Sequence, residues 1–251
     1  MADSLLKVDQ VSQRFGGLLA VNAASFEVEA DSITALIGPN GAGKTTLFAI
    51  IAGFQNPSEG RITFAAEEIT GIEPHLLARR GLVRTFQIVQ PFATLTVRDN
   101  IAVGAHLRHP DRRAALDKAE IIARQLGLGQ LLDRPAENLT VSARKRLELA
   151  RALAAEPRLL LLDEVMAGLN PSEVRDLLPV IRDIREGGTT ILLIEHVMQA
   201  VMNLSDRVHV LAEGKIIASG RPEDVVDNEE VIEAYLGEGA ARQYGTSGRP
   251  S

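Results

Sequence analysis

The glycine-rich segment at residues 38–45 has the residue types needed to bind phosphate. It reads Gly38-Pro39-Asn40-Gly41-Ala42-Gly43-Lys44-Thr45 and matches G-x-x-x-x-G-K-[ST] at every fixed position. Glycines allow the positive φ angles that turn successive N–H groups inward, and a helix that begins there adds partial positive charge. Lys44 could then reach the β- and γ-phosphates, and the Thr45 hydroxyl could bind Mg²⁺. The segment predicts a phosphate loop; a glycine turn with a surface lysine is the alternative.

Two adjacent carboxylates form the second candidate group. Asp163 and Glu164 directly follow the apolar run at residues 159–162, and open α/β sheets bind their ligands at the carboxyl ends of such strands. Asp163 suits Mg²⁺ through water, and Glu164 suits a general base for an attacking water. The alternative is that the pair caps a helix. The sequence contains no Asn-Lys-x-Asp guanine-specificity element, which argues against a GTPase.

Strands and one helix must position these groups. Residues 33–37 predict a strand just before the phosphate loop, and residues 45–52 predict a helix that stops at Gly53. Further strands are predicted at residues 5–8, 25–29, 61–64, 81–86, 158–162 and 189–194, and a hairpin at 206–218. The fold class is therefore α/β.

The composition changes after residue 90. Alanine, leucine, arginine and glutamate dominate up to residue 155, with helical spacing at residues 114–126 and 143–155. We therefore predict a nucleotide-binding α/β core at residues 1–90 and 156–237. An all-α helical subdomain is inserted at residues 91–155, and residues 238–251 form a disordered tail.

Composition and charge exclude several functions. The 251 residues include no cysteine, so there is no disulfide framework and no thiol nucleophile. The longest stretch without Asp, Glu, Lys or Arg, residues 45–58, is too short and too polar to span a membrane, and the N-terminus does not resemble a secretory signal, so we expect a cytoplasmic chain. With a net charge of −6, we expect no nucleic-acid partner. We interpret two basic clusters as solvated helix faces, namely Arg79, Arg80 and Arg84, and Arg144, Lys145 and Arg146.

In order and spacing, these motifs resemble the ATP-binding subunits of ABC transporters over almost the whole chain. The resemblance implies a P-loop NTPase sheet core with an inserted helical subdomain, and ATP with Mg²⁺ as ligands. It makes residues 38–45 the Walker A loop and Asp163 and Glu164 the end of the Walker B strand. It implies that Gln87 is the Q-loop glutamine, which contacts Mg²⁺ and the membrane partner, and that His196 is the switch histidine, which contacts the γ-phosphate.

The same resemblance completes the site. It places Phe15 where an aromatic ring stacks on adenine and Asn170 in the D-loop. Taken singly, Phe15 would be a core residue, Gln87 a polar strand end and His196 a helix cap. The implied catalytic residues are Glu164, His196 and Lys44, and the Mg²⁺ ligands are Thr45, Gln87 and Asp163. The implied nucleotide contacts are Phe15, Gly38, Pro39, Asn40, Gly41, Ala42, Gly43, Lys44, Thr45, Thr46, Gln87, Asp163, Thr140, Ser142 and Asn170.

Four further sequence segments resemble those of the branched-chain amino acid importers. These segments are residues 15–22, 78–87, 167–173 and 231–237. This resemblance implies an ATPase that powers import of a small polar solute, with membrane permeases, a second ATP-binding subunit and, indirectly, a solute-binding protein as partners. It places the chain peripherally at the inner face of the cell membrane. The alternatives are urea or amide import, lipid export, a nucleic-acid-associated ABC ATPase and a soluble phosphate-loop kinase.

One segment departs from the family pattern. The family's signature loop reads Leu-Ser-x-Gly-Gln, and this chain has Leu139-Thr140-Val141-Ser142-Ala143 there. Thr140 keeps the hydroxyl, but Ser142 replaces the glycine and Ala143 replaces the glutamine. An added Cβ limits close backbone approach, and a lost amide removes polar contacts. We therefore expect the ATP site that this loop offers to a partner subunit to be the weaker one.

Overall fold

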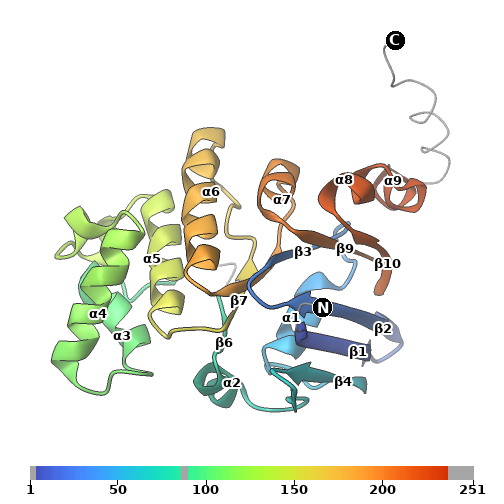
Figure 1. Cartoon of the computed structure of the whole chain (residues 1–251), viewed down its shortest axis with the longest axis horizontal. Helices are drawn as coiled ribbons and strands as arrows, with labels where there is room; N and C mark the ends of the chain where they lie inside the picture. The colour runs from blue at the N-terminus through green and yellow to red at the C-terminus, as the bar shows by residue number, and fades with distance from the viewer. Residues whose placement is uncertain (1–3, 86–89, 237–251) are drawn as a thin grey trace, which may run out of the picture. The chain divides into compact units, whose positions relative to one another are not determined.

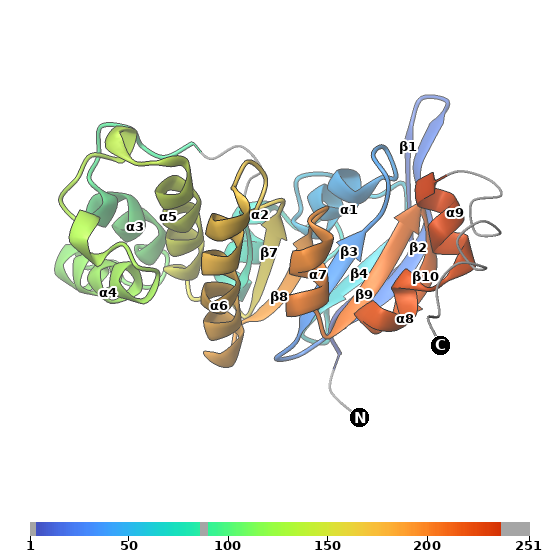
Figure 2. The same ribbon diagram turned by 90° about the horizontal axis from the view of Figure 1, so that it is seen from above.

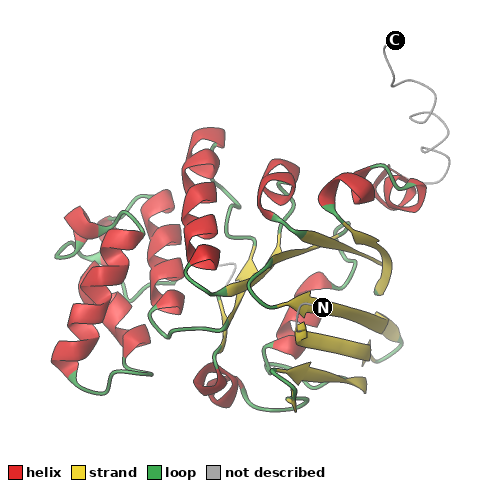
Figure 3. Ribbon diagram, in the orientation of Figure 1, coloured by secondary structure: helices red, strands yellow, loops and turns green. Residues whose placement is uncertain are grey.

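The described residues, 4–85 and 90–236, form two compact units in the computed structural model (Figure 1). Unit 1 combines residues 1–71 with residues 194–251, and unit 2 comprises residues 72–193. Both units contain helices and strands (Figure 3), as an α/β fold requires. Within the described ranges, no helix is long and apolar enough to cross a membrane.

Unit 1 contains a four-stranded antiparallel sheet in the order β2-β1-β4-β5. Its strands are β1 (Ser4–Phe15), β2 (Leu18–Glu29), β4 (Glu59–Phe64) and β5 (Glu67–Glu68). The strands predicted at residues 5–8 and 25–29 are present, but each is part of a 12-residue strand in a long β1–β2 hairpin (Figure 2). Gln10 and Ala23 have positive φ angles, and the register shifts near them. These irregularities break the alternating pattern that reveals a strand in a sequence.

Unit 1 also holds the strand that leads into the phosphate loop. β3 (Ile33–Ile37) pairs in parallel with β9 (Arg207–Ala212), which forms an antiparallel hairpin with β10 (Lys215–Gly220). The predicted hairpin at residues 206–218 is thus confirmed. All five β3 residues are buried, as expected of a strand covered on both faces. The helices of this unit are α1 (Lys44–Ile51), α7 (Met198–Leu204), α8 (Pro222–Val226) and α9 (Glu229–Leu236).

Unit 2 carries the strand that leads into the two carboxylates. The order is β8-β7-β6, for β8 (Thr190–Ile194), β7 (Leu159–Asp163) and β6 (Leu82–Arg84). Besides these strands it contains α2 (Pro74–Arg80), α3 (Val97–Ala105), α4 (Arg112–Gln125), α5 (Val141–Leu153), α6 (Pro171–Glu186) and two 3₁₀ turns, η1 (Gly129–Leu131) and η2 (Ala136–Asn138). The predicted strands at residues 158–162 and 189–194 and the helices at 114–126 and 143–155 are confirmed, with ends shifted by one or two residues.

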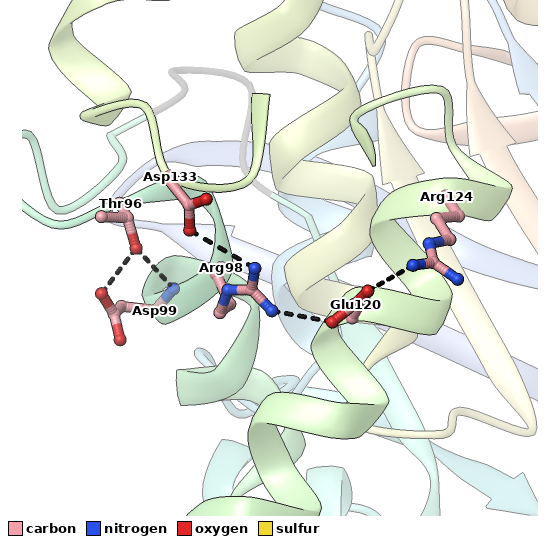
Figure 4. A network of polar contacts seen from close by, with 6 residues as sticks. All are labelled: Thr96, Arg98, Asp99, Glu120, Arg124 and Asp133. Atoms are coloured by element: carbon pink, nitrogen blue, oxygen red, sulfur yellow. Dashed lines mark hydrogen bonds and ion pairs between the residues drawn. The ribbon is translucent and has the colours of Figure 1, made fainter. Parts of the chain in front are cut away.

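Helices α3, α4 and α5 and the two 3₁₀ turns fall within residues 91–155, the range of the predicted helical subdomain. Arg98 on α3 joins two other parts of this region. It donates to Glu120 on α4 at 2.8 Å and to Asp133 at 3.3 Å (Figure 4). Asp133 lies just after η1, so one guanidinium ties α3 to the next helix and to the following turn. The boundaries of the subdomain stay a prediction.

Candidate nucleotide-binding site

The phosphate loop connects β3 to α1, and the predicted order of strand, loop and helix is confirmed. Gly38 and Gly43 have φ angles of 150° and 102°, which L-residues with a Cβ rarely adopt. A Cβ would lie 1.9 Å from the Leu211 carbonyl oxygen at Gly38 and 2.3 Å from that of Ala20 at Gly43. Both glycines are therefore required, because the loop packs directly against the backbones of β9 and β2.

The turn between β9 and β10 supports the loop from a second side. The Gly214 N–H donates to the carbonyl of Ala42 at 3.0 Å, and the Gly214 carbonyl accepts from the N–H of Asn22 at 2.8 Å. Ala42 is itself buried. One turn thus ties the phosphate loop to β2, which holds the backbone N–H groups in place before an anion binds.

Lys44 has its ammonium group over the loop that it follows. The Nζ donates to the carbonyls of Gly38 at 2.7 Å and Pro39 at 2.9 Å. Gly43 is the N-cap of α1 and supplies no side-chain hydrogen bond, so no side-chain oxygen competes with an anion for the first N–H groups of the helix. The loop therefore combines backbone donors, a helix N-terminus and one positive charge, which is the chemistry of a triphosphate site.

Asp163 and Glu164 stand at the end of β7 in unit 2. The Asp163 side chain is 3% exposed and accepts a hydrogen bond from Arg84 Nη2 at 2.7 Å. Glu164 is partly exposed and has a φ of 48°, a conformation that costs a residue with a Cβ about 1–2 kcal/mol. Its carbonyl accepts from the N–H of Ala167 at 3.0 Å and from Lys145 Nζ at 3.4 Å. Strain at this position fits a carboxylate held for chemistry.

Mg²⁺ fits the donor types that the chain offers. Thr45 and Asp163 present a hydroxyl and a carboxylate, the hard oxygen ligands that Mg²⁺ prefers. Gln87, the third predicted ligand, lies outside the described residues. Among the described residues, no group of three or more His, Cys, Asp and Glu is placed to hold a metal ion. Such a donor set suits an ion held mostly by phosphate oxygens and water.

The other predicted residues lie at exposed ends of elements. Phe15 ends β1 and is 48% exposed, so its ring is available for stacking. His196, between β8 and α7, is also exposed. The side chain of Asn170 accepts from the N–H groups of Ser172 and Glu173 and forms the capping box of α6, which gives it a structural role of its own.

The altered signature loop forms the start of α5. Thr140 is the N-cap, and its hydroxyl accepts from the N–H of Ala143 at 3.2 Å. Val141 is 57% exposed, while Ser142 and Ala143 are half-buried. The hydroxyl kept at Thr140 therefore already serves the helix that it caps.

Two basic residues that we expected on solvated surfaces are buried in the structure. We interpreted Arg84 and Lys145 as parts of solvated helix faces, and this was wrong, because both are largely buried. Arg84 ends a strand rather than a helix and pairs with Asp163, and Lys145 contacts the Glu164 carbonyl. The available signal was that Arg84 falls inside the strand predicted at residues 81–86, not in a helix.

Tyr235 is a further residue that sequence reasoning missed. Burial raises the pKa of its hydroxyl, and a hydrogen bond from the backbone of Gly38 opposes that shift. The C-terminal helix α9 thus reaches the first residue of the phosphate loop. Nothing in the local sequence of α9 pointed to that contact.

Comparison with known proteins agrees with this geometry. Residues 21–167 match the family model described as "ABC transporter", and residues 215–241 match "Branched-chain amino acid ATP-binding cassette transporter". The chain belongs to the ABC transporter family. It therefore carries the P-loop ATPase fold of that family.

Relatives of this ABC subunit match it over nearly its whole length. The "High-affinity branched-chain amino acid transport ATP-binding protein LivG" of Salmonella typhimurium is 44% identical over 95% of this chain and 100% of its own length. The corresponding protein BraF of Pseudomonas aeruginosa is 42% identical over the same shares. Among solved structures, the ADP conformation of an ATP-binding cassette of an ABC transporter aligns with a TM-score of 0.86 and 33% identity, over 94% of this chain and 100% of that one.

Proposed function

We propose that this ABC subunit binds MgATP, hydrolyses it, and powers import of branched-chain amino acids through partner permeases. The observation that carries the proposal is 44% identity over 95% of the chain to a branched-chain amino acid transport ATP-binding protein. The separate match of residues 215–241 supports the same solute class. The phosphate loop and the strained Glu164 support the hydrolytic part.

The residues divide the chemistry among them. The loop N–H groups and Lys44 hold the triphosphate, and Phe15 stacks on the base. Thr45, Asp163 and Gln87 hold Mg²⁺, which when bound neutralises charge on the phosphate oxygens. Glu164 takes a proton from the attacking water.

Two further groups of residues contact nucleotide, one within the subunit and one across the dimer. His196 contacts the γ-phosphate, and Thr140 and Ser142 of one subunit face the nucleotide held by the Walker A loop of a second ATP-binding subunit. ATP binding thereby closes a dimer, and hydrolysis opens it again.

A cavity in unit 2 is our candidate for permease docking. It has a volume of about 270 Å³ and lies at the end of β6, where the chain enters the segment that holds Gln87. Val83, Val103 and Leu107 give it an apolar lining, and its charged lining residues are Arg84, Glu148 and Arg151. Burial lowers the pKa of Arg151, and Glu148 opposes that shift. A short amphipathic helix from a permease would suit such a lining, and the subunit would then lie at the inner face of the membrane.

Reconstitution tests the proposal. The subunit, the permeases that co-purify with it and their solute-binding protein are placed in vesicles with MgATP, and uptake of labelled leucine is compared with uptake of labelled urea. We expect ATP-dependent leucine uptake that Glu164→Gln abolishes. Urea uptake alone would overturn the assigned solute, and capture of no permease would overturn the transport role.

A further inference from the structure

The ion pair between Arg84 and Asp163 joins two strands of unit 2 at the end where the carboxylates emerge. β6 and β7 are parallel, and Arg84 pairs with Leu161. Residues that pair directly share a face of the sheet, and Asp163 is two positions after Leu161, so Arg84 and Asp163 lie on the same face. The arginine side chain spans that offset, and Nη2 lies 2.7 Å from Oδ2 of Asp163.

Both side chains of this ion pair are largely shielded from solvent, unlike those of a surface ion pair. The side chains of Arg84 and Asp163 are 10% and 3% exposed. An ionised carboxylate that is so poorly hydrated needs an opposite charge nearby, because its lost hydration is otherwise uncompensated. Arg84 supplies that charge, and its donor also sets the direction in which Oδ2 points.

Thr85 holds the backbone of the same aspartate. Its hydroxyl accepts from the N–H of Asp163 at 3.3 Å and donates to the carbonyl of Leu161 at 3.3 Å. Its own N–H donates to that carbonyl at 2.9 Å. Arg84, the last residue of β6, therefore holds the carboxylate of Asp163, and Thr85, the residue after β6, holds its main chain.

We propose that Arg84 is the resident counter-ion of Asp163: it balances the charge of the carboxylate and orients it before a divalent cation arrives, and it lowers the affinity of the site for that cation. The inference rests on the proposed MgATP site. The affinity is lowered because the guanidinium has already neutralised the charge that attracts the cation, and it repels the second positive charge. Arg84 is thus a positioning residue that acts through Asp163.

Substitutions at Arg84 separate charge from hydrogen bonding. Arg84→Gln keeps a donor and removes the charge, and Arg84→Lys keeps the charge. Arg98→Gln is the matched control, because Arg98 in the same unit also pairs with carboxylates, those of Glu120 and Asp133 (Figure 4). The full chain with a non-hydrolysable ATP analogue is titrated with Mn²⁺, and free Mn²⁺ is read by electron paramagnetic resonance.

We expect Arg84→Gln to bind Mn²⁺ roughly tenfold more tightly than the wild type, and Arg84→Lys and Arg98→Gln to stay within about twofold. Binding of the analogue in EDTA should be the same in all four proteins. If Arg84→Gln binds Mn²⁺ as tightly as the wild type or more weakly, the inference about Arg84 is overturned, while the proposed function stands. A wild type that binds neither the analogue nor Mn²⁺ overturns the proposed function, and the inference with it.

Folding gives a second measurement. Arg84→Gln leaves a buried carboxylate without its counter-ion, so we expect a lower melting temperature without nucleotide. Adding Asp163→Asn removes the remaining charge and should restore most of the loss. If the double variant is as unstable as Arg84→Gln, the two side chains are not coupled, and the inference is overturned even where the single variant fails to fold.

Discussion

The buried histidine of β9 should make the free energy of unfolding of this subunit depend on pH. His209 is 3% exposed, and its ring packs on Phe26 with the centroids 4.9 Å apart. Nε2 lies 3.2 Å from the Glu27 carbonyl, which only accepts, so Nε2 carries the proton. Nδ1 then accepts from the Ser219 hydroxyl at 2.7 Å. The neutral ring has partners for both nitrogens, and it links β9 to β2 and β10.

Burial lowers the pKa of His209 to about 4, with a further contribution from Arg207, while the hydrogen bond to Glu27 opposes the shift. The unfolded chain binds this proton at a pKa near 6.5. The stabilisation by the neutral ring is thus complete above pH 6.5 and is lost as the pH falls toward 4. At about 1.4 kcal/mol per pH unit, the loss is about 2 kcal/mol at pH 5 and about 3 kcal/mol at pH 4.

Urea unfolding at pH 7 and pH 5 measures this loss. Between pH 7 and pH 5 the free energy of unfolding should fall by about 2 kcal/mol less in His209→Gln than in the wild type, because glutamine does not titrate. His75→Gln is the control, since His75 is an exposed histidine, and it should keep the wild-type change. Equal changes in His209→Gln and the wild type, within about 0.5 kcal/mol, would refute the assignment of a neutral buried ring.

Three predictions concern the nucleotide site itself. Lys44→Ala should lower ATP affinity at least ~10-fold, because charge-assisted hydrogen bonds are lost, while circular dichroism stays unchanged; wild-type hydrolysis would contradict it. Glu164→Gln should bind MgATP but hydrolyse it roughly 10²–10⁴-fold more slowly and elute as a dimer in size-exclusion chromatography, and unchanged turnover would exclude Glu164 as the base. Ser142→Gly with Ala143→Gln should raise ATP-driven dimerisation about tenfold or more, and no gain would show that Thr140 and the helix N-terminus suffice.

The phosphate loop was predictable because its constraints are local. Glycines at fixed intervals, a lysine and a hydroxyl stand in one continuous segment, and the strand before it is apolar at nearly every position. The carboxylates were predictable for the same reason, since they follow directly on a buried run. The roles of Phe15, Asn170 and His196 came from the family resemblance and stay predictions.

What the sequence did not reveal depends on contacts between distant segments. Arg84 becomes a buried counter-ion only through the register of β6 against β7, which lie far apart in the sequence. Tyr235 approaches Gly38 only because the chain returns to the phosphate loop near its C-terminus. Charge clustering treats every arginine of a cluster alike, so it assigned Arg84 to the surface together with Arg79 and Arg80.

The C-terminal helix α9 lies within residues 215–241, which match the branched-chain transporter model, and it contacts the phosphate loop. Leu211 of β9 and Tyr235 of α9 both approach the start of the phosphate loop, where the Leu211 carbonyl excludes any Cβ at Gly38 and Tyr235 contacts the same glycine. The Gly214 turn holds the loop at Ala42. A change in α9 could thus alter how firmly the loop is held without touching a phosphate contact. Tyr235 is therefore the contact by which the segment that matches the branched-chain transporter model reaches the nucleotide-binding loop.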